Sequence, residues 1–467
     1  MNDTAFSSLA DLARGLKKGT YSSRELTQMF LDRIARYDDK AHAYIAVYGE
    51  SALLQAQAAD LQRQAGLPLP PLHGLPIAVK DLCEIEGQVT AAGSLAWKSR
   101  RSTVTSAVVE RLQAAGMIIL GKTHTVEFAF GGWGTNPHMG TPRNPWDWSE
   151  HHRIPGGSSS GSAVAVAAGL APAAIGSDTG GSVRVPSALN GLTGLKTTRG
   201  LISLYGTVPL SATLDTIGPL ARTAEDAALL TQALAGFDPR DPNTRECRLD
   251  AITPTRSISL RHLRIAVMQP KQYPWPVADD IHLATEEAAR VFQSLGARIE
   301  SVEIPVDFAE LMRNNGTITA AEGYRLHVDY IEDPELPFGP AVKKRIINGK
   351  SVNASAYLAA LAHRRETIAR FNDWMQSYDC LLTPSVPFVA CPLHEVDEDS
   401  TSIVAFGRPV NYLNACALSV PAGFSEEGLP IGVQLIAKPY QENLLLQAGN
   451  SFQNVTDWHR RRPPELQ

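Results

Sequence analysis

Two glycine-rich turns on either side of one apolar segment constrain this chain more than any other feature. The first turn reads Gly156-Gly157-Ser158-Ser159-Ser160-Gly161, and the second reads Asp178-Thr179-Gly180-Gly181-Ser182-Val183-Arg184. Between them, residues 163–170 are alanine-rich and long enough for a short helix. Glycine lets the backbone adopt positive φ and lets a substrate approach the main chain closely. Successive N–H groups in such turns bind anions, so a serine beside them is a candidate nucleophile with its own oxyanion hole.

A base for such a serine lies far upstream. Residues 75–81, Leu-Pro-Ile-Ala-Val-Lys-Asp, form a short apolar run that ends in opposite charges. This pattern predicts a buried strand that delivers Lys80 to a cleft at its end. Lysine at its ordinary pKa of about 10.4 is charged at neutral pH, and burial lowers that pKa. A direct pair with Asp81 would oppose this shift, so we expect the Asp81 side chain to point away, toward the backbone.

Helix and strand patterns alternate around these motifs. Residues 107–116 are typical of a helix and residues 117–120 of a buried strand. The same order recurs at residues 163–170 and 173–176. This alternation predicts an α/β sheet with helices on both faces.

Three segments lie outside this pattern. Residues 1–65 predict amphipathic N-terminal helices, whose apolar sides could cover their own sheet or a second copy of the chain in a homodimer. Residues 305–365 predict helices interrupted by prolines, which suits a lid or a substrate-facing cap. Residues 237–256 are rich in Pro, Asp and Arg, and predict a surface excursion or a seam between two halves.

Composition excludes several classes of function. The net charge of −5 lacks the excess of positive charge that binds nucleic acid or anionic lipid. Five cysteines without a C-x-x-C spacing argue against a disulfide framework or a structural zinc site, and favour a reducing, cytoplasmic compartment. Cys83 is expected to be a small buried residue near Lys80. The sequence shows no signal-peptide pattern and no apolar run long enough to span a membrane.

With Lys80, Ser158 and Ser182 set side by side, the chain resembles the amidase signature family. The resemblance implies one domain over residues 1–467, built on a single large mixed β-sheet with helices on both faces. It is weakest between residues 237 and 378. The matching segments are Ile77-Ala78-Val79-Lys80-Asp81, Gly156-Gly157-Ser158-Ser159-Ser160-Gly161-Ser162, Gly176-Ser177-Asp178-Thr179-Gly180-Gly181-Ser182-Val183-Arg184, Gly194-Leu195-Lys196-Thr197, Asp215-Thr216-Ile217-Gly218-Pro219-Leu220 and residues 428–436.

The resemblance implies a Ser–cisSer–Lys triad. Ser182 matches the nucleophile, Ser158 the bridging serine with a cis peptide bond, and Lys80 the base. The spacing between the two serines, 182 − 158 = 24 residues, agrees with the family motif. Such a triad needs no metal and no cofactor, and the four histidines His124, His138, His151 and His152 are interpreted as ordinary polar residues.

Other residues of the two turns are expected to support the triad. The residues expected to donate backbone N–H groups to the oxyanion are Thr179, Gly180, Gly181 and Ser182. Asp178 and Arg184 are expected to form a charge pair that fixes the second turn, and Ser159 resembles a hydrogen-bonding residue behind the triad. The residues matching the family's acyl pocket are Phe128, Phe130, Gly131 and Trp133. These rings would favour an apolar or aromatic substrate, unless they belong to the core.

Three functions remain open. The first is hydrolysis of a small carboxamide to a carboxylic acid and ammonia or an amine. The second is the A subunit of a tRNA-dependent amidotransferase, which releases ammonia from glutamine inside a complex. That protein holds glutamine with an acidic residue where this chain has Ile403 and Val404, which weakens the second hypothesis. Asn414 and Cys416 also replace residues common in the family. The third function, a catalytically silent scaffold, conflicts with the intact Lys80 and serines.

Overall fold

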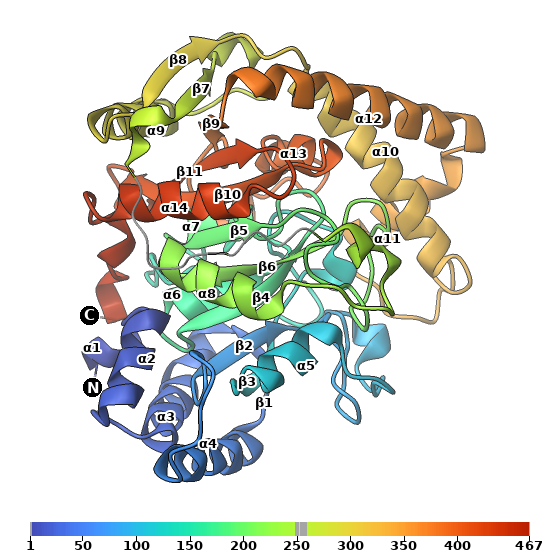
Figure 1. Cartoon of the computed structure of the whole chain (residues 1–467). Coiled ribbons are helices and arrows are strands. Elements are labelled where there is room, and N and C mark those ends of the chain that lie inside the picture. Colours follow the sequence, from blue (N-terminus) through green and yellow to red (C-terminus); the bar gives the residue numbers. More distant parts are fainter. Residues whose placement is uncertain (1, 248–251, 253–258, 467) are drawn as a thin grey trace.

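Eleven strands of the described chain form one mixed β-sheet (Figure 1). The computed structural model describes residues 2–247, 252 and 259–466. The strand order across the sheet is β1-β3-β2-β4-β6-β5-β10-β11-β9-β7-β8. The strands are β1 Tyr44–Val47, β2 Pro76–Lys80, β3 Ile118–Thr123, β4 Ala173–Asp178, β5 Thr193–Lys196, β6 Thr216–Ala221, β7 Arg264–Met268, β8 Arg298–Val302, β9 Cys380–Pro384, β10 Cys416–Phe424 and β11 Pro430–Ala437.

Helices cover both faces of this sheet. Leu381 and Leu382 in β9 show why, because successive side chains of a strand point to opposite faces. Leu381 packs in a cluster with residues of α10, α12 and α13, whereas Leu382 packs with residues of α8, α9 and α14. The helices are α1 Asn2–Ala5, α2 Leu9–Lys18, α3 Ser23–Ala41, α4 Gly49–Gln64, α5 Ala107–Ala114, α6 Ser160–Ala167, α7 Arg184–Leu189, α8 Ala224–Leu234, α9 Asp279–Ser294, α10 Phe308–His327, α11 Pro340–Asn348, α12 Ala354–Trp374, α13 Arg408–Tyr412 and α14 Glu442–Gln453.

Strand direction places the two predicted turns and the lysine at one edge of the sheet. β2 runs parallel to both β3 and β4. Parallel strands end at the same edge, so Lys80, at the end of β2, lies near Asp178, at the end of β4. The second glycine turn follows Asp178 directly, and the first turn leads into α6, which packs on β2, β3 and β4.

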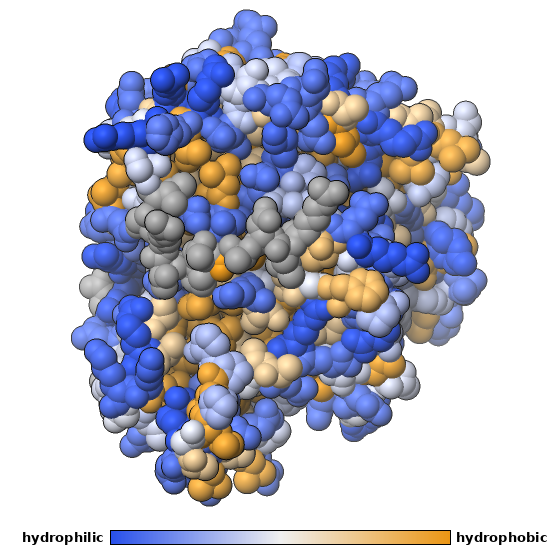
Figure 2. Space-filling view, viewed as in Figure 1, coloured by the Kyte–Doolittle hydropathy of each residue, from blue (hydrophilic) through white to orange (hydrophobic). Residues whose placement is uncertain are grey.

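The N-terminal helices pack on their own fold. Ser8 caps α2, and Ser22 with Glu25 forms a capping box on α3. The apolar sides of both helices are buried in the core cluster that also contains β2 and α6. In contrast, α4 leaves Leu54 and Leu61 exposed, and Figure 2 shows apolar residues over α4 at the foot of the molecule. The homodimer stays a prediction.

The proline-interrupted segment consists of the helices α10, α11 and the start of α12 (Figure 1). Pro340 stands at the first position of α11, where its missing N–H costs no hydrogen bond. Of the predicted excursion at residues 237–256, residues 237–247 contain a short 3₁₀ helix, and residues 248–251 and 253–256 lie outside the described residues. No helix in the described part of the chain is long and apolar enough to cross a membrane.

Candidate active site

Lys80 ends β2 in a fully buried position surrounded by serine hydroxyls. Its Nζ donates to Ser158 Oγ at 2.7 Å, to Ser177 Oγ at 2.9 Å and to Ser159 Oγ at 3.0 Å. Burial lowers the pKa of Lys80 to about 7, although Cys83 and more distant carboxylates act in the opposite direction. At neutral pH, a substantial fraction of this lysine is therefore an uncharged amine with a free lone pair.

Asp81 faces away from Lys80, as predicted. Its Oδ2 accepts a hydrogen bond from the Ala91 N–H at 3.1 Å, and its Oδ1 lies 3.5 Å from Lys122 Nζ. A second buried lysine thus takes the carboxylate that would otherwise hold Lys80 in its charged form. Cys83 is also buried, as expected, and burial raises the pKa of its thiol to about 11.

Among the three hydroxyls around Lys80, Ser159 already uses its own proton. Ser159 Oγ donates to the Ser177 carbonyl at 3.2 Å, so toward Lys80 it acts as an acceptor. The Ser158 hydroxyl has no other acceptor for its proton within the described residues, and it is the nearest of the three to Nζ. When Lys80 is neutral, Ser158 is therefore suited to donate its proton to the lysine.

The first turn holds Ser158 through its backbone. The Gly157–Ser158 peptide bond is cis. The Ser158 carbonyl accepts hydrogen bonds from Val126 N–H at 3.2 Å and from Thr125 Oγ1 at 3.0 Å. The Ser159 N–H donates to the Ser182 carbonyl at 3.3 Å, which joins the first turn to the second. Ser158 and Ser182 are thus brought to adjacent positions in one site.

Asp178 and Arg184 form the predicted charge pair at the second turn. Arg184 donates to both carboxylate oxygens, from Nη2 at 2.9 Å and from Nε at 3.1 Å, and both side chains are buried. Burial alone would raise the pKa of Asp178, but Arg184 holds it well below its ordinary value. Arg184 also donates to the Asn411 side chain, the Gly407 carbonyl and Gln434, so the pair ties the turn to α13 and β11.

One predicted oxyanion donor is already engaged. The Gly181 N–H donates to Asp178 Oδ1 at 2.8 Å, so the prediction that it faces the oxyanion is wrong for this structure. Its φ of 124° turns the peptide toward the carboxylate, a conformation that glycine adopts readily. The N–H groups of Thr179, Gly180 and Ser182 have no acceptor within the described residues. These three remain the candidate oxyanion donors.

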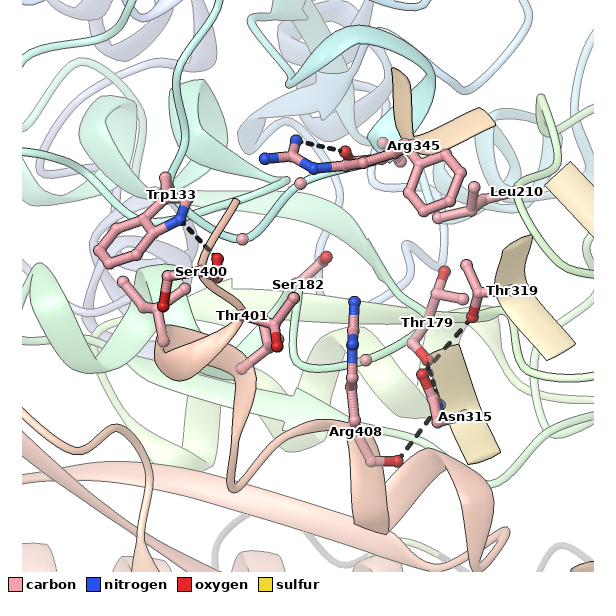
Figure 3. A pocket seen from close by; sticks show the side chains of 17 residues that line it. Trp133, Thr179, Ser182, Leu210, Asn315, Thr319, Arg345, Ser400, Thr401 and Arg408 are labelled. Atoms are coloured by element: carbon pink, nitrogen blue, oxygen red, sulfur yellow. Dashed lines mark hydrogen bonds between the residues drawn. The ribbon is translucent and has the colours of Figure 1, made fainter. Parts of the chain in front are cut away.

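A small pocket opens in front of the second turn (Figure 3). Its volume is about 50 Å³, which is room for a few water molecules. Three predicted residues line it, namely Phe130, Gly131 and Trp133. The other lining residues are Ala129, Gly132, Thr179, Gly180, Ser182, Leu210, Asn315, Thr319, Arg345, Ser400, Thr401, Ile403, Val404 and Arg408.

Phe128 does not line this pocket, so its predicted role in substrate binding is wrong. Phe128 and Ala129 adopt left-handed φ values of 51° and 59°, and the turn directs the Phe128 ring elsewhere. The ring packs 5.0 Å from Trp97 and 4.3 Å from His327, measured between ring centroids. Phe128 therefore belongs to the core, which was the alternative to a place in the acyl pocket.

Several residues of the site have no role assigned by the sequence motifs, although Ser177 lies within one of them. Ser177 could have been found, because Val79 pairs with Ile175 in parallel strands and the residue two positions further lies beside Lys80. Asn315, Arg345 and Arg408 come from α10, α11 and α13, and no local pattern marks them. Asn414 and Cys416, which stand where the family commonly has other residues, do not line the pocket.

The fold and this arrangement of lysine and serines define an enzyme that hydrolyses amide C–N bonds. The chain belongs to the Amidase family, whose model matches residues 25–446.

Relatives of known name span nearly the whole chain. It is 39% identical over 493 aligned residues to the A subunit of the glutamyl-tRNA(Gln) amidotransferase of Pseudomonas syringae pv. syringae strain B728a, covering 97% of this chain and 98% of that protein. It is also similar to the native peptide amidase of Stenotrophomonas maltophilia, at 31% identity and a TM-score of 0.85 over 98% of both chains. A third likeness is to a vestigial protein complex that reveals the origins of an s-triazine catabolic enzyme, at 35% identity and a TM-score of 0.90 over 96% of this chain and 98% of that one.

Proposed function

We propose that this chain hydrolyses a small carboxamide through an acyl-enzyme on Ser182. The observation that carries the proposal is the environment of Lys80. A fully buried amine with a pKa near 7 contacts a serine hydroxyl at 2.7 Å and faces no carboxylate of its own. Such an amine is a general base at neutral pH.

In the proposed reaction, Ser182 Oγ attacks the amide carbonyl carbon while its proton passes to Ser158, whose own proton passes to Lys80 Nζ. The carbonyl oxygen gains negative charge beside the N–H groups of Thr179, Gly180 and Ser182. The C–N bond then breaks, and the relay returns a proton to the leaving nitrogen, which departs as ammonia or an amine. Water attacks the resulting ester by the same route, which releases the carboxylic acid and restores Ser182.

A second setting for the same chemistry is supported by the relatives. The Pseudomonas syringae protein and a Nitrosococcus oceani protein, 38% identical over 98% of this chain, are both A subunits of glutamyl-tRNA(Gln) amidotransferases. In that setting, the amide is the side chain of glutamine and the chain works with partner subunits. The comparisons favour this setting over a free-standing amidase, and the acyl-enzyme step is common to both.

Two experiments test the proposal. A fluorophosphonate probe should label the wild-type chain at Ser182, and Ser182→Ala should remain unlabelled. Equal labelling of the two, or none of either, contradicts the nucleophile. Hydrolysis of small amides and of glutamine is then measured for the chain alone and with the partner subunits of an amidotransferase. Glutamine hydrolysis that requires those subunits identifies the second setting, whereas turnover of simple amides by the chain alone identifies the first.

A further inference from the structure

One arginine of the pocket has no counter-charge. Arg408 is the first residue of α13, and its side chain extends into the space between Ser182 and Thr179 (Figure 3). Within the described residues, no hydrogen bond or ion pair reaches its guanidinium group. Burial lowers the pKa of Arg408 to about 10, and the positive charge of Arg345 acts in the same direction.

The other two arginines of this region are satisfied. Arg184 donates to Asp178 and to three further oxygens. Arg345 is paired with the Glu398 carboxylate and donates to the Phe130 carbonyl at 3.0 Å. Arg408 therefore differs from these two arginines, because its guanidinium N–H groups are free to bind a ligand and carry a full positive charge.

The described residues supply no anion to complete this site. Of the seventeen residues that line the pocket, none is Asp or Glu. The nearby carboxylates are engaged elsewhere: Glu398 by Arg345, Asp178 by Arg184, and Asp215 by the N–H groups of Leu210 and Ser211. Arg408 is partly exposed at the pocket, so its guanidinium N–H groups are open to an anionic ligand, which would supply the missing partner.

The backbone around Arg408 makes room for it. A Cβ on Gly180 would lie 2.9 Å from Arg408 Cγ, and a Cβ on Gly316 in α10 would lie 3.3 Å from Nη1. Asn315 Nδ2 lies 3.3 Å from the Arg408 carbonyl and 3.4 Å from the Thr179 carbonyl. The arginine is thus held beside the loop that carries the nucleophile, in the pocket assigned to the acyl group.

From these contacts we propose that Arg408 binds a carboxylate on the acyl part of the substrate, so that the enzyme acts on small monoamides of dicarboxylic acids. The proposal rests on the proposed function for its catalytic step. The pocket offers no acid to an ammonium group, and Ile403 and Val404 contribute only apolar side chains to it. A carboxylate without a neighbouring ammonium therefore suits the pocket better than the pair of charges on glutamine.

The test compares matched amides. Succinamate and its neutral isostere 4-methylpentanamide differ in the carboxylate, and glutaramate and glutamine differ in the ammonium group. The wild-type chain should prefer succinamate over 4-methylpentanamide by about 10- to 100-fold in kcat/KM, the range for a charge-assisted hydrogen bond. It should also prefer glutaramate over glutamine. Arg408→Met should abolish the first preference, Arg408→Lys should retain part of it, and Arg365→Met, an exposed arginine on α12, should retain all of it.

A binding measurement separates this inference from the proposed function. Calorimetry on Ser182→Ala should detect succinamate but not 4-methylpentanamide, and Ser182→Ala with Arg408→Met should bind neither. Wild type without a preference, or a preference that survives Arg408→Met, overturns the inference while leaving the acyl-enzyme intact. If no amide is turned over and no probe labels Ser182, the proposed function fails, and the calorimetry alone then decides whether Arg408 binds a carboxylate.

Discussion

Two buried lysines, Lys80 at the end of β2 and Lys196 at the end of β5, occupy similar positions and have different neighbours. Both lie in the same sheet and both are almost fully buried. Burial lowers the pKa of Lys80 to about 7 and that of Lys196 to about 8. Lys80 contacts three hydroxyls, whereas Lys196 donates to the Thr197 and Ala415 carbonyls, both at 2.7 Å.

This contrast shows that a lowered pKa alone does not make a base. A hydroxyl can give a proton and accept one, but a carbonyl oxygen can only accept. Lys196 therefore acts as a hydrogen-bond donor that holds the backbone of β5 near the start of β10. It can donate these bonds whether its amine is charged or neutral. Lys80 has a neighbour that can deliver a proton, Ser158, and the turn that carries Ser158 is hydrogen-bonded to the turn of Ser182, the proposed nucleophile.

The strongest loss of activity should come from exchanging Lys80 for methionine, with Lys196 as its matched control. Lys80→Met should lower kcat/KM by about 10⁴-fold, at the upper end for loss of a general base. Lys196→Met should change kcat/KM of the folded enzyme by less than about tenfold. It should instead destabilise the fold by about 2–5 kcal/mol, because two buried carbonyls lose their donor. Rates of amide hydrolysis and thermal unfolding are measured for both variants. Similar losses of activity in the two would contradict the assignment of Lys80 as base and Lys196 as structural donor.

A buried charge pair should matter next. Arg184→Met leaves Asp178 as an uncompensated buried carboxylate, which should cost about 3–5 kcal/mol of stability and disorder the second turn. Arg290→Met, which removes an exposed partner of Glu286 and Glu287 on α9, should cost less than about 1 kcal/mol. Urea unfolding of both variants gives the two free energies. A small loss for Arg184→Met would mean that the turn does not depend on its charge pair.

The dependence of kcat/KM on pH should also distinguish Lys80 from Lys196. Lys80 must be neutral to accept a proton, and its pKa is near 7. Below that pH, kcat/KM should therefore fall by about tenfold per unit, and above it kcat/KM should level off. Burial raises the pKa of Asp215, which contacts Thr179, to about 6. Because Asp215 would also titrate near pH 6, the fall of kcat/KM with falling pH is best fitted above that value. Lys196→Met should leave the midpoint unchanged. A flat profile from pH 6 to pH 9 would exclude Lys80 as the base.

The mildest change should follow substitution of two neighbouring rings. Phe128 and Phe130 are close in sequence, but the first lies in an aromatic cluster and the second lines the pocket. Phe130→Leu should change KM for small amides several-fold. Phe128→Leu should leave KM unchanged and lower the unfolding free energy by about 1 kcal/mol. Steady-state kinetics with both variants decides this, and a change in KM for Phe128→Leu would return that ring to the pocket.

The parts of the site that short motifs encode could be predicted from the sequence. Lys80, Ser158 and Ser182 lie in runs whose residues are adjacent in the chain, and β2 and β4 are parallel neighbours, so sequence order and spatial order agree. The α/β sheet followed from the same alternation of patterns. The direction of Asp81 also followed, because a direct pair would have kept Lys80 charged.

The rest depends on contacts between distant segments. Arg408 and Asn315 reach the second turn from 226 and 133 residues beyond Ser182, by the differences 408 − 182 and 315 − 182, and no periodicity in α10 or α13 marks them. The Gly181 N–H was misassigned because its direction is set by a φ value that composition does not reveal. Phe128 was misassigned because two successive left-handed residues turn its ring away.

The strand order also has a consequence for how the protein is made. Of the described strands, β10 and β11 are the last to leave the ribosome, yet they lie inside the sheet between β5 and β9. Until they arrive, a nascent chain carries β5 and β9 as open edges, which invite pairing with other chains. The serines of the two turns emerge early, whereas α13 and its arginine emerge just before β10. A newly made chain thus holds Lys80 and the serines before it holds Arg408, and the two parts of its sheet are joined only after β10 and β11 have emerged.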